Sequence, residues 1–166
     1  MKVIRFLDEN IEKMICVLCL ATMSVLIVVQ VFFRYVLNNS LSWSEEMARY
    51  LFIWMIYIGI SYGVKMDKHI CVDAVYAIMP KKAQHPYAIV AYGLFLVFAI
   101  AIVYYGDLVV GMQITSGQVS PAMGIPMQYV YAAPVVGMIL TTIRLIQSIG
   151  GEVKAMKSGD LEEKGE

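Results

Sequence analysis

Two cysteines near the start of the sequence have the spacing of a reactive thiol site. Cys16 and Cys19 form a C-x-x-C pair, which occurs in redox motifs and in zinc sites. However, the pair lies in an apolar, uncharged stretch, where the thiolate that such chemistry needs is disfavoured. The other candidate ligands, Cys71, His69 and His85, fall in a later charged segment without zinc-like spacing. We therefore expect the cysteine pair to pack within a helix and the chain to need no cofactor. A membrane redox enzyme is the alternative.

Charged side chains, which could bind or relay ions, avoid the middle of every long apolar stretch. Glu45, Glu46 and Arg49 stand at the start of one such stretch. Asp107 stands near the end of another. Ionisable groups in the middle of a membrane usually mark a path for ions or substrate. Their absence predicts a chain that is not an enzyme and has no catalytic, substrate-binding or metal site. The main alternative is a self-contained small multidrug-type exporter or channel acting as a homo-oligomer, which would need an acid within the bilayer.

The apolar stretches themselves have the length and composition of membrane-spanning helices. Sixty per cent of the residues are apolar, against roughly 45–50% in an ordinary soluble domain. A helix of about 20 residues crosses the roughly 30 Å of the hydrocarbon core. We predict an all-α integral membrane protein with four transmembrane helices in residues 1–150, followed by a disordered cytoplasmic tail, 151–166. The four predicted spans are residues 14–34, 43–64, 86–113 and 127–147.

Local signals predict where three of these helices begin or end. Ser42 and Glu45 have the S-x-x-E spacing of a capping box, which would satisfy two backbone donors at the start of the second helix. Pro86 suits the first turn of the third helix, where its missing N–H costs nothing. Gly150 and Gly151 are predicted to end the fourth helix.

Lys and Arg are distributed unevenly between the two sides of the predicted bundle. Eleven of the thirteen are assigned to the side of the amino terminus, the middle connector and the carboxyl end, whereas the side of the first and third connectors has two, Arg34 and Arg49. Cytoplasmic segments carry the excess of Lys and Arg in membrane proteins. We therefore predict that both termini and the middle connector are cytoplasmic. The absence of a basic cluster interleaved with aromatic residues argues against nucleic-acid binding.

Three features predict contacts between helices or with another protein. Gly59 and Gly63 form a G-x-x-x-G motif, which lets a second helix approach closely either within the chain or from a partner. Glu45 and Arg49 are four residues apart, and so they form an ion pair at the membrane interface or a contact for a partner. Arg34 has the same two interpretations, an interfacial anchor or a docking residue.

Four short motifs, taken in this order, resemble those of one family. Arg34-Tyr35 closes the first span, and Trp43 to Tyr50 (WSEEMARY) opens the second. The segment from His69 to Asp73 (HICVD) follows the second span, and Pro121 to Pro126 (PAMGIP) precedes the fourth. The chain resembles the small, DctQ-like membrane subunits of TRAP (tripartite ATP-independent periplasmic) transporters over nearly its whole length. Met123 stands where a leucine is expected, and Gln128 where a tryptophan is common.

The resemblance implies a non-catalytic subunit of the bacterial inner membrane. In this family a periplasmic substrate-binding protein captures an organic acid, often a C4-dicarboxylate or sialic acid. A large membrane subunit then moves it by a sodium-coupled elevator motion, and the small subunit is a scaffold that also offers surface to the binding protein. The residues that we expect at these interfaces are Arg34, Trp43, Glu45, Glu46, Arg49, Gly59, Gly63, His69, Asp73, Pro121 and Pro126.

Overall fold

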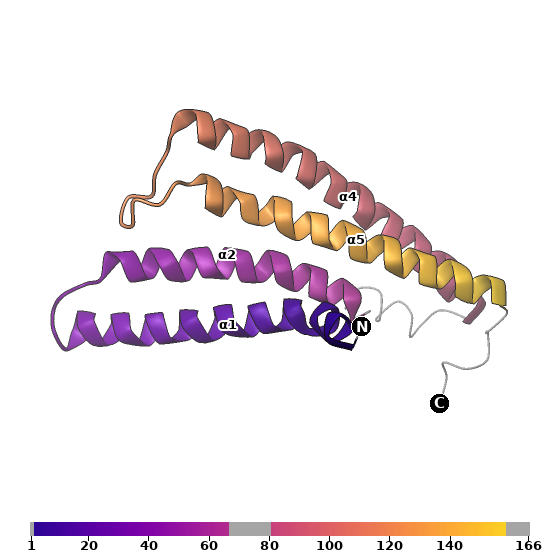
Figure 1. Ribbon diagram of the computed structural model, residues 1–166, viewed down its shortest axis with the longest axis horizontal. Coiled ribbons are helices and arrows are strands. Elements are labelled where there is room, and N and C mark those ends of the chain that lie inside the picture. Colours follow the sequence, from indigo (N-terminus) through magenta and orange to yellow (C-terminus); the bar gives the residue numbers. More distant parts are fainter. Residues whose placement is uncertain (1, 67–80, 159–166) are drawn as a thin grey trace.

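The computed structural model consists of four long helices, and it describes the backbone of residues 2–66 and 81–158 together with most of their side chains. The helices are α1 (Lys2–Tyr35), α2 (Ser42–Lys65), α4 (Lys81–Ser116) and α5 (Gln128–Ser158) (Figure 1). Each contains a segment long and apolar enough to cross a membrane. These segments are Ile11–Tyr35, Ser42–Lys65, Pro86–Ser116 and Gln128–Lys154. The prediction of an all-helical protein with four spans is therefore confirmed.

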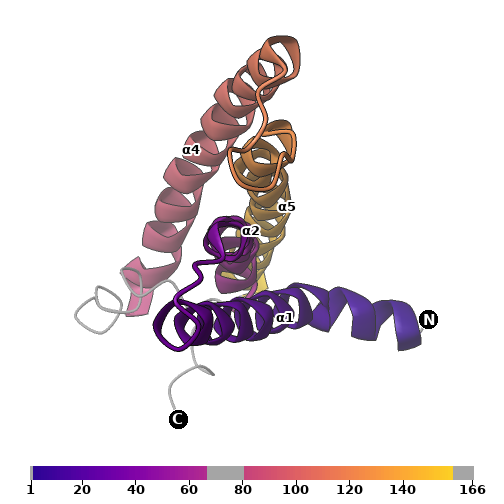
Figure 2. The same ribbon diagram turned by 90° about the vertical axis from the view of Figure 1, so that its left-hand side faces the viewer.

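The four helices form an open row. α1 contacts α2, α2 contacts α5 and α5 contacts α4, and no other pair of helices packs together within the described residues. The end-on view shows α2 and α5 in the middle of the row (Figure 2). Helices that follow one another in the sequence run antiparallel. The amino end of α1 and the carboxyl end of α5 therefore point in the same direction along the helix axes (Figure 1).

The contact between α2 and α5 joins the two helical hairpins, and it depends on small residues. Gly137 on α5 is buried, and a Cβ atom there would lie 2.5 Å from the Cβ of Tyr57 and 2.8 Å from its carbonyl carbon and oxygen. Ala133 and Thr141, one turn away on either side, are both fully buried. A stripe of small residues four apart allows two helix backbones to approach closely. Gly137 thus sets the distance between the two halves of the row.

An apolar core extends from this crossing toward the edge helix α4. Val64 on α2, Tyr92 and Ala99 on α4, and Met138 and Leu145 on α5 are all buried. Lipid tails are as apolar as these side chains, so close packing and dispersion, rather than exclusion of water, hold the helices together within a membrane.

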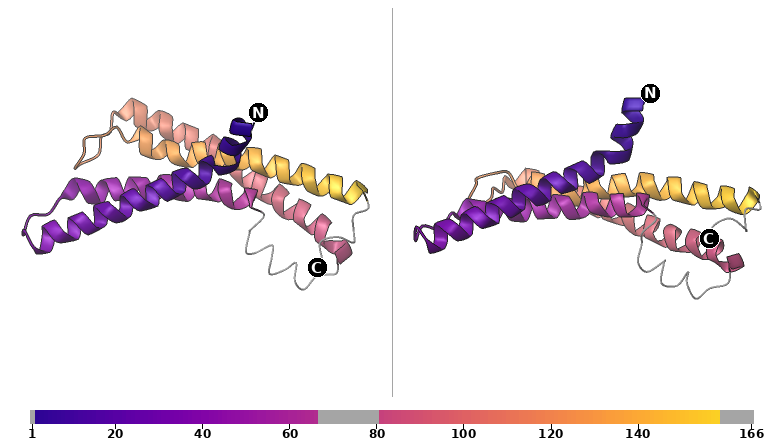
Figure 3. Two further views of the ribbon diagram at one scale, coloured as in Figure 1. Left: turned by 60° about the horizontal axis from the view of Figure 1, so that its bottom comes forward. Right: turned by 90° about the horizontal axis from the view of Figure 1, so that it is seen from below.

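The two edge helices leave most of their apolar surface uncovered. On α1, Leu18 is 68% exposed and Val28 is 69% exposed. On α4, Leu94 is 69% exposed and Val97 is 68% exposed. In Figure 3, α1 lies along one side of the row with its first turns bent away from the other helices. Surfaces this apolar are typical of proteins that face lipid or another membrane protein.

The helix ends differ from the sequence predictions in three places. Leu41 is the N-cap of α2, and no side-chain hydrogen bond caps this end, so the predicted capping box is wrong. The hydroxyl of Ser44 instead donates a hydrogen bond to the Leu41 carbonyl at 2.8 Å. α4 begins at Lys81, which puts Pro86 inside the helix rather than in its first turn. α5 continues through Gly150 and the following glycine to Ser158. Backbone hydrogen bonding along a helix tolerates two glycines at a cost of about 1 kcal/mol each.

Candidate partner-binding surface and its internal supports

Glu46 lies near the start of α2 and holds the loop between α4 and α5. Its side chain is only 7% exposed. The Oε2 atom accepts hydrogen bonds from the backbone N–H of Ala122 at 2.9 Å and of Met123 at 3.0 Å. The Oε1 atom accepts the Tyr50 hydroxyl at 2.5 Å. A carboxylate makes stronger hydrogen bonds than a neutral acceptor, so Glu46 fixes the loop firmly to α2.

The loop itself, residues 117–127, is folded as a small hairpin. Val119 and Pro126 form an antiparallel bridge. The Ser120 N–H donates to the Ile125 carbonyl at 2.8 Å, and the Ile125 N–H donates back to the Ser120 hydroxyl at 3.3 Å. Gly124 has a φ of 68°, a conformation that glycine adopts without steric cost. The loop therefore has a defined shape that depends on its own residues and on Glu46.

Glu45, the neighbour of Glu46, faces α1. It accepts a hydrogen bond from the side-chain amide of Gln30 and lies 3.6 Å from the guanidinium of Arg34. The Arg34 and Glu45 side chains are about half exposed, at 57% and 47%. Within the described residues, the ion pair of Glu45 is thus formed with Arg34 and not with Arg49, the partner expected from the sequence. Arg49 is left exposed at the same end of α2.

Several of the predicted partner-contact residues are exposed near the start of α2 and on the 117–127 hairpin. Trp43 is 45% exposed beside Glu45. Pro121 and Pro126 are exposed on the hairpin that Glu46 supports. The structure thus brings the WSEEMARY and PAMGIP motifs together, although about 75 residues separate them in the sequence. Only Glu46, being buried, lies beneath this surface rather than on it.

The other predicted contact residues lie elsewhere. Gly59 faces α1, where an added Cβ would lie 3.9 Å from the sulfur of Cys16, whereas an added Cβ at Gly63 would meet nothing within 4 Å. Gly59 therefore supports packing within the chain, and Gly63 leaves room on the surface of α2. His69 and Asp73 lie outside the described residues.

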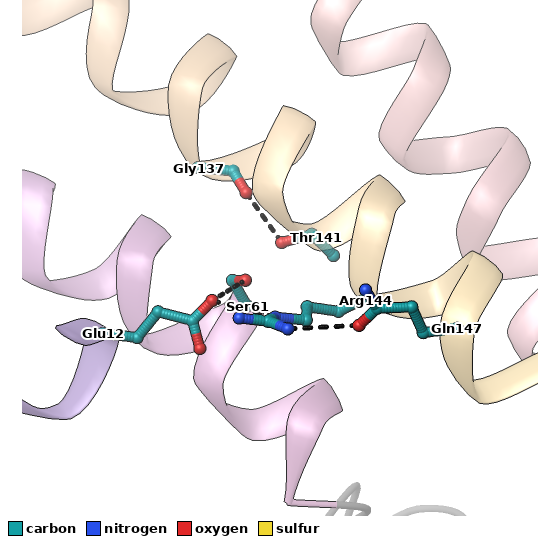
Figure 4. A network of polar contacts seen from close by, with 6 residues as sticks. All are labelled: Glu12, Ser61, Gly137, Thr141, Arg144 and Gln147. Carbon is teal, nitrogen blue, oxygen red and sulfur yellow. Dashed lines mark hydrogen bonds and ion pairs between the residues drawn. The ribbon is translucent and has the colours of Figure 1, made fainter. Parts of the chain in front are cut away.

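A second polar cluster joins three helices, at the first third of α1, near the carboxyl end of α2 and in the middle of α5 (Figure 4). Glu12 of α1 is 3% exposed, and its Oε1 accepts hydrogen bonds from the Ser61 hydroxyl and from Nε of Arg144, each at 3.1 Å. The Arg144 side chain is 11% exposed and also donates to Gln147 at 3.1 Å. Since α1 and α5 do not pack against each other, this ion pair links them directly.

Cys16 and Cys19 lie on α1, and Cys16 contacts α2. Cys16 and Cys19 are both half-buried on α1, and the Cys16 thiol donates to the Met55 carbonyl of α2 at 3.7 Å. In residues 2–66 and 81–158, no three His, Cys, Asp or Glu side chains are grouped so that they could hold a metal ion.

Sequence reasoning missed Glu12, Arg144 and Gly137. Glu12 precedes the first predicted span by two residues, and no local signal connects it with Arg144. The signal for Gly137 was present, because Ala133, Gly137 and Thr141 repeat small residues at intervals of four. That spacing is as strong a packing motif as Gly59 and Gly63.

The four apolar spans, the exposed edge helices and the internally bonded polar ends define a multi-pass helical membrane protein that presents large surfaces to its surroundings. Comparison with known proteins identifies its family. Residues 23–155 match the family described as Tripartite ATP-independent periplasmic transporters, DctQ component. The chain therefore belongs to the DctQ family: it is a small permease subunit of a TRAP transporter, a non-catalytic transport component.

The names of individual relatives mention different substrates. The chain is 29% identical over 164 residues to the isethionate TRAP transporter permease protein DctMQ of Oleidesulfovibrio alaskensis, covering 95% of this chain and 26% of that protein. It is 34% identical over 92 residues to the C4-dicarboxylate TRAP transporter small permease protein DctQ of Vibrio cholerae, covering 55% of this chain and 40% of that protein. It is 26% identical over 140 residues to the ectoine TRAP transporter small permease protein TeaB of Halomonas elongata, covering 84% and 72%. The chain thus spans about a quarter and two fifths of the first two relatives.

Proposed function

We propose that this chain is the scaffold of a sodium-coupled secondary transporter that takes up an organic acid of the C4-dicarboxylate or sialic acid class. Its partners are a large membrane subunit, which moves the substrate, and a periplasmic substrate-binding protein. The relative named DctMQ supports the first partner, because this chain corresponds to only 26% of that longer permease protein. The names of the relatives differ in substrate, which is consistent with selection of the substrate by other chains of the system.

The observation that carries the proposal is that the buried charged side chains are bonded to other parts of the same chain. Glu12 is paired with Arg144 and with Ser61, and Glu46 is bonded to a loop and to Tyr50. The buried charged groups within the described spans, Glu12, Glu46 and Arg144, are thus bonded to other groups of the chain itself. A charged solute crossing the membrane needs polar or charged groups that are available to it.

The uncovered edges of the row supply the surfaces that a scaffold needs. α1 and α4 each pack on one neighbour and expose long apolar faces. We assign these faces to the lipid bilayer and the large subunit. Membrane orientation follows the charge asymmetry: both termini and the middle connector are cytoplasmic, and the hairpin of residues 117–127 lies on the outer side of the bacterial inner membrane.

Reconstitution tests the proposal. The chain alone in proteoliposomes should move no organic acid, and adding the large subunit, the binding protein and a sodium gradient should restore uptake. Affinity purification from native membranes should recover a large polytopic protein with the chain. Solute flux through the purified chain alone would instead show a self-contained homo-oligomeric carrier and would overturn the proposal.

A further inference from the structure

Glu46 is a buried carboxylate of α2 that binds the loop between α4 and α5. Its side chain is 7% exposed, so its carboxylate is covered by the chain itself. Its Oε2 atom holds two consecutive backbone N–H groups, those of Ala122 and Met123, at 2.9 Å and 3.0 Å. Both groups belong to a loop that is 76 and 77 residues away in the sequence. What Glu46 controls is therefore the position and rigidity of that loop.

The loop is an ordered, uncharged tip with charged groups close by. Pro121, Ala122 and Gly124 are exposed, and the hairpin bonds around Ser120 hold their backbone in one shape. A binding surface that is ordered in advance avoids the entropy cost of ordering on association. Glu45 and Arg49 are exposed near Glu46 at the start of α2, and polar residues commonly border protein interfaces.

The position of the tip favours a soluble partner over the membrane subunit. The large exposed apolar faces belong to α1 and α4 along their length, whereas the tip lies beyond the ends of α4 and α5 (Figure 1). Eleven of the thirteen Lys and Arg belong to the segments that would face the opposite, cytoplasmic side. In this orientation the tip is accessible to a water-soluble protein on the outer side of the membrane.

We infer that Glu46 is a positioning residue that holds the 120–126 tip in the shape bound by the soluble substrate-binding protein. This inference rests on the proposed function, since that function supplies the binding protein. Tyr50 contributes from below: its hydroxyl donates to Glu46 Oε1 at 2.5 Å and lies 3.6 Å from the Met127 sulfur at the base of the loop.

Two substitutions at the same position separate geometry from charge. Glu46→Ala removes both acceptor atoms and frees the tip. In Glu46→Gln the amide oxygen can still accept the two backbone N–H groups, and the amide NH2 can donate to the Tyr50 oxygen while that hydroxyl turns to Met127. With the assembled complex in proteoliposomes, uptake is measured against the concentration of substrate-loaded binding protein. We expect E46A to raise the apparent KM for the binding protein about tenfold with little change in maximal rate, because one charge-assisted hydrogen-bond pair is lost. E46Q should stay within about twofold of the unmodified complex.

A direct readout of the tip accompanies the kinetics. A nitroxide attached at Ala122→Cys, in a chain whose native cysteines are replaced, should become more mobile when Glu46→Ala is added and stay immobile with Glu46→Gln. Asp107→Ala, which removes an exposed carboxylate on α4, is the matched control and should change neither measurement. Equal impairment of E46A and E46Q would show that charge and not loop shape matters, and it would overturn the inference, as would an unchanged KM in E46A.

Failure of the inference can be told from failure of the proposed function. If the unmodified complex shows no uptake that depends on the binding protein, the proposed function itself is wrong. If uptake is normal but a photo-crosslinker at Ala122 captures the large membrane subunit and not the binding protein, the function stands and the assignment of the tip is wrong.

Discussion

Replacing Gly137 with alanine should loosen the connection between the two hairpins of this protein. The added Cβ would lie 2.5 Å from the Cβ of Tyr57 and 2.8 Å from its carbonyl carbon and oxygen. None of these atoms can rotate away, because two belong to the backbone and the third is fixed to it. α2 and α5 must therefore separate by roughly 0.9 Å to reach an ordinary contact distance.

The size of the effect follows from two opposing terms. Overpacking a close contact costs about 1–3 kcal/mol, and the blocked atoms at Tyr57 put Gly137 at the upper end of that range. Alanine regains about 1 kcal/mol over glycine through its better helix propensity. The net destabilisation at Gly137 is therefore about 2 kcal/mol. Gly63→Ala is the matched control, because its new Cβ meets nothing within 4 Å and should stabilise the helix by up to about 1 kcal/mol.

The two variants can be compared by titrating SDS into detergent-solubilised protein and following the fluorescence of Trp43 and Trp54. G137A should unfold at lower SDS than the unmodified chain and G63A at the same or higher SDS, with a difference of about 3 kcal/mol between them. If G137A proves as stable as G63A, the α2–α5 crossing does not depend on a glycine, and the reasoning about the open row fails at its central contact.

Three further outcomes follow from the structure. Glu12→Ala should destabilise the folded chain by about 3–5 kcal/mol in the same SDS titration, because it leaves Arg144 charged in a buried site. Replacing both residues with leucine should recover most of this lost stability. Equal destabilisation in the single and double variants would contradict a specific pair. Alanine at both Cys16 and Cys19 should leave uptake by the assembled complex unchanged, whereas loss of uptake together with a thiol-dependent signal would revive a redox role. Charge reversal at the exposed Arg49 should lower uptake in proteoliposomes while the apparent sodium affinity stays constant; a large shift in sodium affinity would argue for a role in ion binding.

Membrane insertion depends on the composition of segments about 20 residues long, which is why the sequence alone gave the four spans. The same local information predicted a third span ending at residue 113 and a fourth beginning at residue 127, close to the observed end of α4 at Ser116 and start of α5 at Gln128. Helix ends were less predictable. The signals at Ser42, Pro86 and Gly150 describe local preferences of about 1–2 kcal/mol or less, and contacts along a long helix override preferences of that size.

The motif residues at the candidate surface were identified from the sequence, but their arrangement was not. Nothing in the order of residues shows that Glu46 bonds to Ala122, or that Glu45 pairs with Arg34 rather than with Arg49. Both facts depend on where α1, α2 and the hairpin meet in space.

The composition of the chain determined that it is a helical membrane protein with four apolar spans. The tertiary structure decided the order of the helices in the row, the close approach at Gly137 and the ion pair between Glu12 and Arg144, which are 132 residues apart. The physical reason is that lipid and protein interior are equally apolar. Hydropathy therefore locates a span but does not show which of its faces packs against another helix.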